Sequence, residues 1–199
     1  MGPPLGKLLP GLLTGRVPPL HRRPKGPVKT RLRIGIVDLV ARGPQSFSAV
    51  FPRLMHSNFA AIMPQVIATW CEQLGHEVTL VCYTGFEDLQ KELPDCDLVF
   101  IGGFTESAQL AYALSNRFRS KGAITAMGGP HARCYPQDAA KYFDYVLGFT
   151  DKALIDGLLR DCAQHRPLGV QLCAARQPAT LPGVRERWKF IEPTLRKAP

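Results

Sequence analysis

Most of the motifs that mark a known cofactor or catalytic site are absent from this chain of 199 residues. The GxGxxG fingerprint of dinucleotide-binding folds does not occur, and neither does the GxxxxGK[ST] phosphate loop or the GxSxG turn of hydrolases. The segment Ala41–Ser46 lacks the serine- and threonine-rich phosphate loop of a flavodoxin. A phosphorelay receiver would need an aspartate at the end of the third expected strand, where this chain has Gly102. These absences argue against the commonest uses of an α/β fold.

Cysteine pairs with metal-ligand spacing are also missing. None of the six cysteines belongs to a CxxC pair or a CxxxCxxC triplet, so we expect no zinc site and no iron–sulfur cluster built from this chain. No apolar run approaches the ~18 residues that a membrane span needs. Leu8–Leu13 is interrupted by Pro10-Gly11, which is unlike a secretory signal. Unpaired cysteines fit a reducing compartment, so we expect a cytoplasmic protein without a membrane partner.

Acidic residues are missing from the first part of the chain. Residues 1–31 hold seven of the 25 basic residues, seven of the 18 prolines and no acidic residue. We expect 1–31 to be a disordered basic tail. The rest of the chain has 18 basic and 16 acidic residues, a balance that gives no reason to expect a nucleic-acid partner. We divide that part into an α/β domain, 32–165, and a C-terminal extension or connector, 166–199.

From residue 32 onward, short apolar runs alternate with helical patterns. Helix 62–74, for example, carries Ile62, Val66, Trp70 and Leu74 at i, i+4 spacing and ends at Gly75. Alternation of this kind predicts right-handed βαβ units and a parallel sheet covered on both faces. We expect a flavodoxin-like (Rossmann-like) three-layer domain with strand order 2-1-3-4-5. Its five strands are expected at 33–38, 78–82, 97–101, 123–127 and 144–147.

Paired glycines follow two of these expected strands. In the expected fold, ligands bind at the carboxyl ends of the first and third strands, beside the long loop 39–57. Glycine at such a position lets the backbone approach a ligand closely. Thr105 is expected to be the N-cap of the next helix. The two turns are Gly102-Gly103-Phe104-Thr105 and Gly128-Gly129-Pro130-His131.

The second turn, together with the segment Asp144-Tyr145-Val146-Leu147-Gly148, resembles a known family. Over about 33–159 the chain is similar to the cobalamin-binding domain found N-terminal in cobalamin-dependent radical SAM enzymes. The resemblance implies that cobalamin is the cofactor and that the glycine turns line the slot for its nucleotide tail. The cofactor-binding residues that it implies are Asp38, Val40, Gly43, Gly102, Gly103, Phe104, Thr105, Gly128, Gly129, Pro130, His131 and Gly148.

The chain departs from this family after its first strand. Cobalamin domains that ligate cobalt carry Asp-x-His-x-x-Gly, whereas this chain reads Asp38-Leu39-Val40-Ala41-Arg42-Gly43. Val40 offers no lone pair, so cobalamin is expected to be base-off with no histidine ligand and its cobalt held by the corrin alone. The barrel that binds the iron–sulfur cluster and S-adenosylmethionine is not in the sequence. The expected role is therefore to position cobalamin for a radical SAM domain or subunit, without catalysis by this chain alone.

Alternatives remain for the function and for single residues. The same crevice would suit a nucleotide- or sugar-nucleotide-binding module, and a scaffold that binds only protein is a third class. Asp38 and His131 could contact the cofactor. Alternatively, Asp38 could cap backbone amides and His131 could be a turn residue. Phe47, Phe51 and Phe59 could form an aromatic wall for a planar ligand or anchor their loop.

Overall fold

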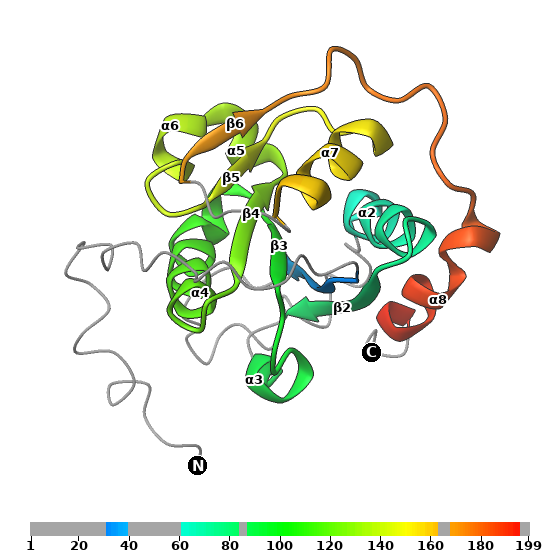
Figure 1. Ribbon diagram of the computed structural model, residues 1–199, viewed down its shortest axis with the longest axis horizontal. Helices are drawn as coiled ribbons and strands as arrows, with labels where there is room; N and C mark the ends of the chain where they lie inside the picture. Colours follow the sequence, from blue (N-terminus) through cyan, green and yellow to red (C-terminus); the bar gives the residue numbers. More distant parts are fainter. Residues whose placement is uncertain (1–30, 40–60, 84–86, 163–167, 196–199) are drawn as a thin grey trace.

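Apolar strands form a parallel sheet at the centre of the molecule (Figure 1). The computed structural model describes residues 31–39, 61–83, 87–162 and 168–195. Within these ranges the strand order is β2-β1-β3-β4-β5-β6, with every neighbouring pair parallel. The strands are β1 (Arg33–Leu39), β2 (Glu77–Tyr83), β3 (Leu98–Gly102), β4 (Ile124–Gly128), β5 (Tyr145–Leu147) and β6 (Val170–Leu172).

Helices cover both faces of this sheet, because alternate strand residues bury apolar side chains on opposite sides. On one face, Phe100 and its neighbours pack against α2 (Ile62–Gln73) and α7 (Lys152–Cys162). On the other face, Ile101 and its neighbours pack against α3 (Leu89–Glu92) and α4 (Ala108–Ser120), with α5 (Pro130–Cys134) and α6 (Pro136–Ala139) alongside. Figure 1 shows the two helix layers on opposite sides of the strands. The α/β class and the order of the first five strands are as expected from the sequence.

The sixth strand was not expected. After Gly169, whose φ is +70°, the chain enters β6 and pairs with β5, so that Tyr145 lies opposite Val170 and Leu147 opposite Leu172. The segment 166–199, expected to be an extension or connector, therefore extends the sheet. It also supplies α8 (Val184–Leu195), which lies against α2 in Figure 1. Arg187 donates from Nη1 to Gln65 Oε1 at 2.7 Å, and the buried Phe190 joins the core on the α2 side.

Two local expectations are corrected at helix starts. Thr105 is not the N-cap of α4, because a short 3-10 helix, η3 (Thr105–Ser107), comes first and α4 begins only at Ala108. Ile62 belongs to the apolar i, i+4 pattern of its helix, yet it is 55% exposed. The middle of the same pattern is as expected, since Val66 and Trp70 are both buried in the core.

Candidate functional site at the carboxyl edge of the sheet

Two glycines, Gly102 and Gly128, lie next to each other where β3 and β4 end. Gly102 and Gly128 are partners in the register of these strands, so their α-carbons face the same side of the sheet, above Phe100 and Ala126. A Cβ added to Gly102 would lie 3.7 Å from Pro64 Cγ of α2, which is ordinary contact. A Cβ added to Gly128 would have no atom within 4 Å. We call Gly102 and Gly128 the glycine strip, a length of bare backbone on the α2 side with open space at Gly128.

The next glycine of each turn faces protein instead of open space. Gly129 has φ +96° and ψ −175°, and a Cβ there would lie 2.9 Å from the carbonyl oxygen of Gly103. A Cβ on Gly103 would lie 2.7 Å from Ser107 Oγ. A Cβ added to Gly148, after β5, would likewise meet protein, because the Sγ of Cys173 would lie 2.6 Å from it. Gly129 therefore lets the two turns touch each other, and of the four glycines in these turns only Gly128 has open space at its Cβ position.

A chain of side-chain hydrogen bonds connects the same two turns. His131, in the first turn of α5, is 3% exposed, and its Nδ1 lies 3.3 Å from Thr105 Oγ1. On the other side of the ring, Nε2 lies 2.6 Å from the hydroxyl of Tyr112 in α4. That hydroxyl donates to Asp138 Oδ2 in α6 at 2.7 Å. We call Thr105, His131, Tyr112 and Asp138 the His131 network.

The network fixes the tautomer of the imidazole. Tyr112 has one hydroxyl proton and gives it to Asp138, so it must accept from His131, which places a proton on Nε2. Nδ1 then has the lone pair and accepts from the Thr105 hydroxyl. Burial lowers the pKa of His131 below its usual value, although Asp138 acts in the opposite direction. Both ring nitrogens are engaged by protein, so His131 acts within the turns and does not offer a nitrogen to the crevice.

Asp38 lies at the end of β1, opposite Gly102 in the register with β3. It is buried, and its Oδ2 accepts a hydrogen bond from the backbone N–H of Ala61, 3.1 Å away, just before α2 begins. Burial raises the pKa of the Asp38 carboxyl to about 6, even though the hydrogen bond from Ala61 acts to lower it. The capping interpretation of Asp38 is thus seen directly, and its carboxyl is a buried group beside the strip.

An exposed apolar residue follows each of four strands at this edge. We call the set the apolar rim, and its exposed fractions lie between 40% and 57%. Ile62 opens the helix after β1, Phe104 and Phe149 follow β3 and β5 closely, and Tyr135 ends the helix after β4. The guanidinium of Arg133 lies 5.6 Å from the centre of the Phe149 ring. These four side chains share the carboxyl edge of the sheet, where a bound ligand would meet exposed apolar surface.

Sequence reasoning missed most of this rim. It identified Phe104 but not Tyr135 or Phe149. An aromatic residue directly after the strand-end glycine was a usable sign for Phe149, which follows Gly148, but not for Tyr135. Several expected residues lie outside the described ranges: Val40, Gly43, Phe47, Phe51 and Phe59. Pro130, which directly follows Gly129, occupies the first position of α5, where proline is favoured.

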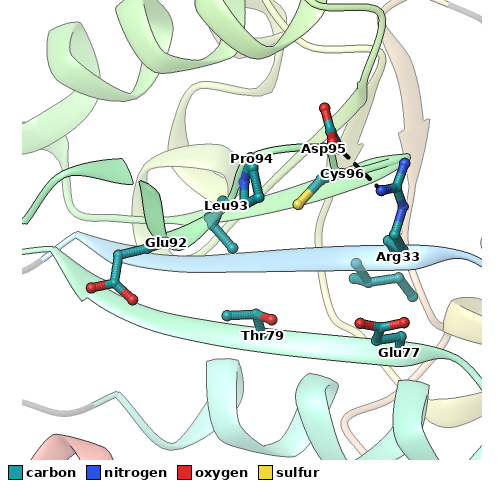
Figure 2. A pocket seen from close by; sticks show the side chains of 9 residues that line it. Arg33, Glu77, Thr79, Glu92, Leu93, Pro94, Asp95 and Cys96 are labelled. Carbon is teal, nitrogen blue, oxygen red and sulfur yellow. Dashed lines mark ion pairs between the residues drawn. The ribbon is translucent and has the colours of Figure 1, made fainter. Parts of the chain in front are cut away.

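A shallow cavity of about 160 Å³ lies elsewhere, at the amino ends of the strands (Figure 2). Arg33 and Glu77 line it where β1 and β2 begin, together with Asp95 and Cys96 just before β3. Arg33 forms an ion pair of 3.7 Å with Asp95. Since Gly102 and Gly128 lie at the other ends of their strands, this cavity is separate from the candidate site.

Searches beyond the site geometry gave no further assignment. In the described part of the chain, no three His, Cys, Asp or Glu side chains are grouped to hold a metal ion. No helix in the described ranges combines the length and hydropathy of a membrane span. Comparison with protein-family models, with curated proteins and with solved structures found no match for this chain.

Proposed function

We propose that this chain is a cobalamin-binding module, with the cofactor held at the carboxyl edge of the sheet. The observation that carries the proposal is the glycine strip, where Gly102 and Gly128 lie side by side and a Cβ added to Gly128 would have no atom within 4 Å. A nucleotide tail needs such a passage along bare backbone. The residues present fit that requirement on the face covered by α2 and α7.

The apolar rim supports the same proposal. A planar macrocycle lying across this edge would cover Phe104 and Phe149 and remove their apolar surface from water, which favours binding. The resemblance of Met127–Ala132 and Asp144–Gly148 to the cobalamin-binding domains of radical SAM enzymes points to the same ligand. Nucleotides and sugar nucleotides would use the strip but leave much of the rim uncovered.

Bound cobalamin supplies the chemistry of the cobalt–carbon bond, and the protein contributes binding and orientation. The nucleotide tail would lie along the glycine strip, and the corrin ring would rest on the apolar rim. Val40, outside the described ranges, replaces the histidine of cobalt-ligating domains, so the proposal is base-off cobalamin without a histidine ligand. The cluster and S-adenosylmethionine would come from a radical SAM domain or subunit.

The proposed location is the cytoplasm. All six cysteines are free thiols, including the exposed Cys134 and Cys173. Exposed thiols persist in reducing compartments, whereas secreted proteins tend to form disulfides.

The test is binding of hydroxocobalamin and methylcobalamin, followed by visible absorbance and thermal unfolding. Ligand at ~100 times its dissociation constant stabilises a fold by roughly 2.7 kcal/mol. For a domain of this size the melting temperature should rise by about 5–10 °C. The bound spectrum should be of the base-off type, and Val40→His should shift it toward a nitrogen-ligated form.

A pair of glycine variants localises the binding. Gly128→Val would fill the strip and should abolish the thermal shift with little loss of stability. Gly157→Val is the matched control, because Gly157 in α7 also has no atom within 4 Å of an added Cβ. It should bind like the unmodified chain. If neither cobalamin produces a shift, the proposal fails, and the same assay with nucleoside diphosphates and sugar nucleotides tests the alternative.

A further inference from the structure

The turns after β3 and β4 touch at three successive points. Gly102 and Gly128 are partners in the sheet register, the backbone of Gly103 lies against the α-carbon of Gly129, and the Thr105 hydroxyl reaches His131. Only the last of these contacts is made by side chains. It is also the only one of the three that contains a titratable group, the imidazole of His131.

The ring of His131 is held from several elements. Thr105 contacts it from η3, Tyr112 from α4, and the ring of Tyr135 lies 5.3 Å away at the end of its own helix. Asp138, in α6, is the carboxylate that acts on the pKa of the ring, and the Tyr112 hydroxyl lies between them. The charge on Asp138 is partly balanced by Lys141, whose Nζ lies 3.1 Å from Oδ1.

We propose that His131 is a positioning residue that, in its neutral form, holds the two glycine turns together and keeps the strip in its binding geometry. Protonation turns Nδ1 into a donor, so the Thr105 hydroxyl must reverse its hydrogen bond, and it places a positive charge in a buried site. Both changes disturb the connection and thereby lower the affinity for the ligand. The inference rests on the proposed function for the identity of the ligand, cobalamin. The connection between the turns is a property of the chain itself.

The direction of the pH effect follows from burial. The pKa of His131 is lower in the folded chain than in an unfolded one, so the folded state prefers the neutral ring. The stabilisation is complete above the unfolded pKa of about 6.5 and decreases as the pH falls below it. Ligand affinity should follow the same direction, constant near pH 8 and weaker toward pH 5.

Four variants separate positioning from simple stability. His131→Leu removes both ring contacts, whereas His131→Gln keeps a donor near the Nε2 position and cannot be protonated in this range. Tyr112→Phe removes the central hydroxyl but keeps the ring, which stacks on Tyr142 with centroids 4.1 Å apart. Tyr142→Phe is the matched control, because it removes a hydroxyl from the same stack and leaves the network complete.

Cobalamin affinity is measured for each variant between pH 5 and pH 8. Loss of a buried hydrogen-bond partner should weaken binding about tenfold at pH 8 in His131→Leu and Tyr112→Phe. Tyr142→Phe should bind like the unmodified chain. At pH 8, the affinity of His131→Gln should lie within about threefold of that of the unmodified chain. Toward pH 5 its affinity should not fall through protonation of residue 131, because glutamine does not titrate.

Nuclear magnetic resonance of the ligand-free protein supplies an independent readout. The amide signals of Gly103 and Gly129 should move with the same midpoint as the His131 ring, and they should not follow pH in this way in His131→Gln. The ring itself should show the tautomer with the proton on Nε2. If His131→Leu does not fold, the same measurements are made on Tyr112→Phe.

The two proposals fail separately. The positioning role is wrong if the amide signals of Gly103 and Gly129 do not shift as His131 titrates. It is also wrong if cobalamin affinity depends on pH in the same way in the unmodified chain and in His131→Gln. If the unmodified chain binds no cobalamin but its glycine amides follow His131, the proposed function is wrong and the positioning role stands.

Discussion

At the residue scale, Asp38 carries an electrostatic cost that the fold tolerates. Its carboxyl is buried at the end of β1, where burial raises the pKa to about 6. The folded state therefore prefers the protonated acid. The resulting stabilisation is present below the unfolded pKa of about 4 and is lost as the pH rises through about 6.

Asp38→Asn should accordingly stabilise the chain at pH 7, by an amount on the order of 2 kcal/mol, because one pKa unit corresponds to about 1.4 kcal/mol. The asparagine oxygen can still accept from the N–H of Ala61. Chemical unfolding at pH 7 and pH 4 measures the effect, which should nearly vanish at pH 4. Asp95→Asn, at an exposed position, serves as the control. Equal stability of Asp38→Asn and the unmodified chain at pH 7 would show that the ionised carboxylate is compensated.

The glycines show how far residue identity alone could locate the site. Two double glycines after apolar strands were enough to predict two turns at the carboxyl ends of parallel strands, and the register of β3 with β4 places them side by side. They could not show which glycine of each pair faces outward, because that depends on the strand register and on the backbone angles of Gly129. A φ of +96° with ψ of −175° is a region nearly restricted to glycine. Gly129 is therefore required by its turn, and Gly128 is the residue beside open space.

At the element scale, long periodic segments and continuous apolar runs were predictable, whereas the short strand β6 was not. The i, i+4 pattern through Val66 and Trp70 located α2, since apolar spacing kept over about three turns is hard to produce by chance. β6 has only three residues and Gln171 is its middle one, so it forms neither an alternation nor an apolar run like that of β5. The start of α4 was misplaced for a different reason. The hydroxyl of Thr105 bonds to His131, a tertiary contact, and no capping hydrogen bond is found at this helix start.

The position of α8 on α2 leads to a prediction about the C-terminal segment. Phe190 is 4% exposed in the core shared with α2, whereas Trp188 on the same helix is 51% exposed. Phe190→Ala should cost about 3–5 kcal/mol through lost burial and a cavity. Trp188→Ala should cost less than about 1 kcal/mol, because its ring is only half covered. Urea unfolding measures both, and equal effects would mean that α8 does not pack as a core element.

At the scale of the whole molecule, one continuous sheet carries both helix layers and the C-terminal segment. β6 pairs with β5 at one edge, while α8 packs on α2, the helix between β1 and β2, and β2 is the strand at the other edge. The segment 168–195 thus reaches from one edge of the fold to the other. Elements that share a core in this way are expected to unfold together.

The two tryptophans test this cooperativity, because Trp70 is buried in α2 and Trp188 lies on α8. Trp188→Phe leaves a fluorescence probe of the core, and Trp70→Phe leaves a probe of α8. In each variant, the urea transition followed by fluorescence should coincide with the transition followed by far-ultraviolet circular dichroism. Trp70→Phe should lower the midpoint, since it removes buried volume, but the two signals should still agree. If Trp188 fluorescence changes at lower urea than the dichroism, α8 detaches before the sheet unfolds, and the segment would then be a docked extension of a smaller cooperative core.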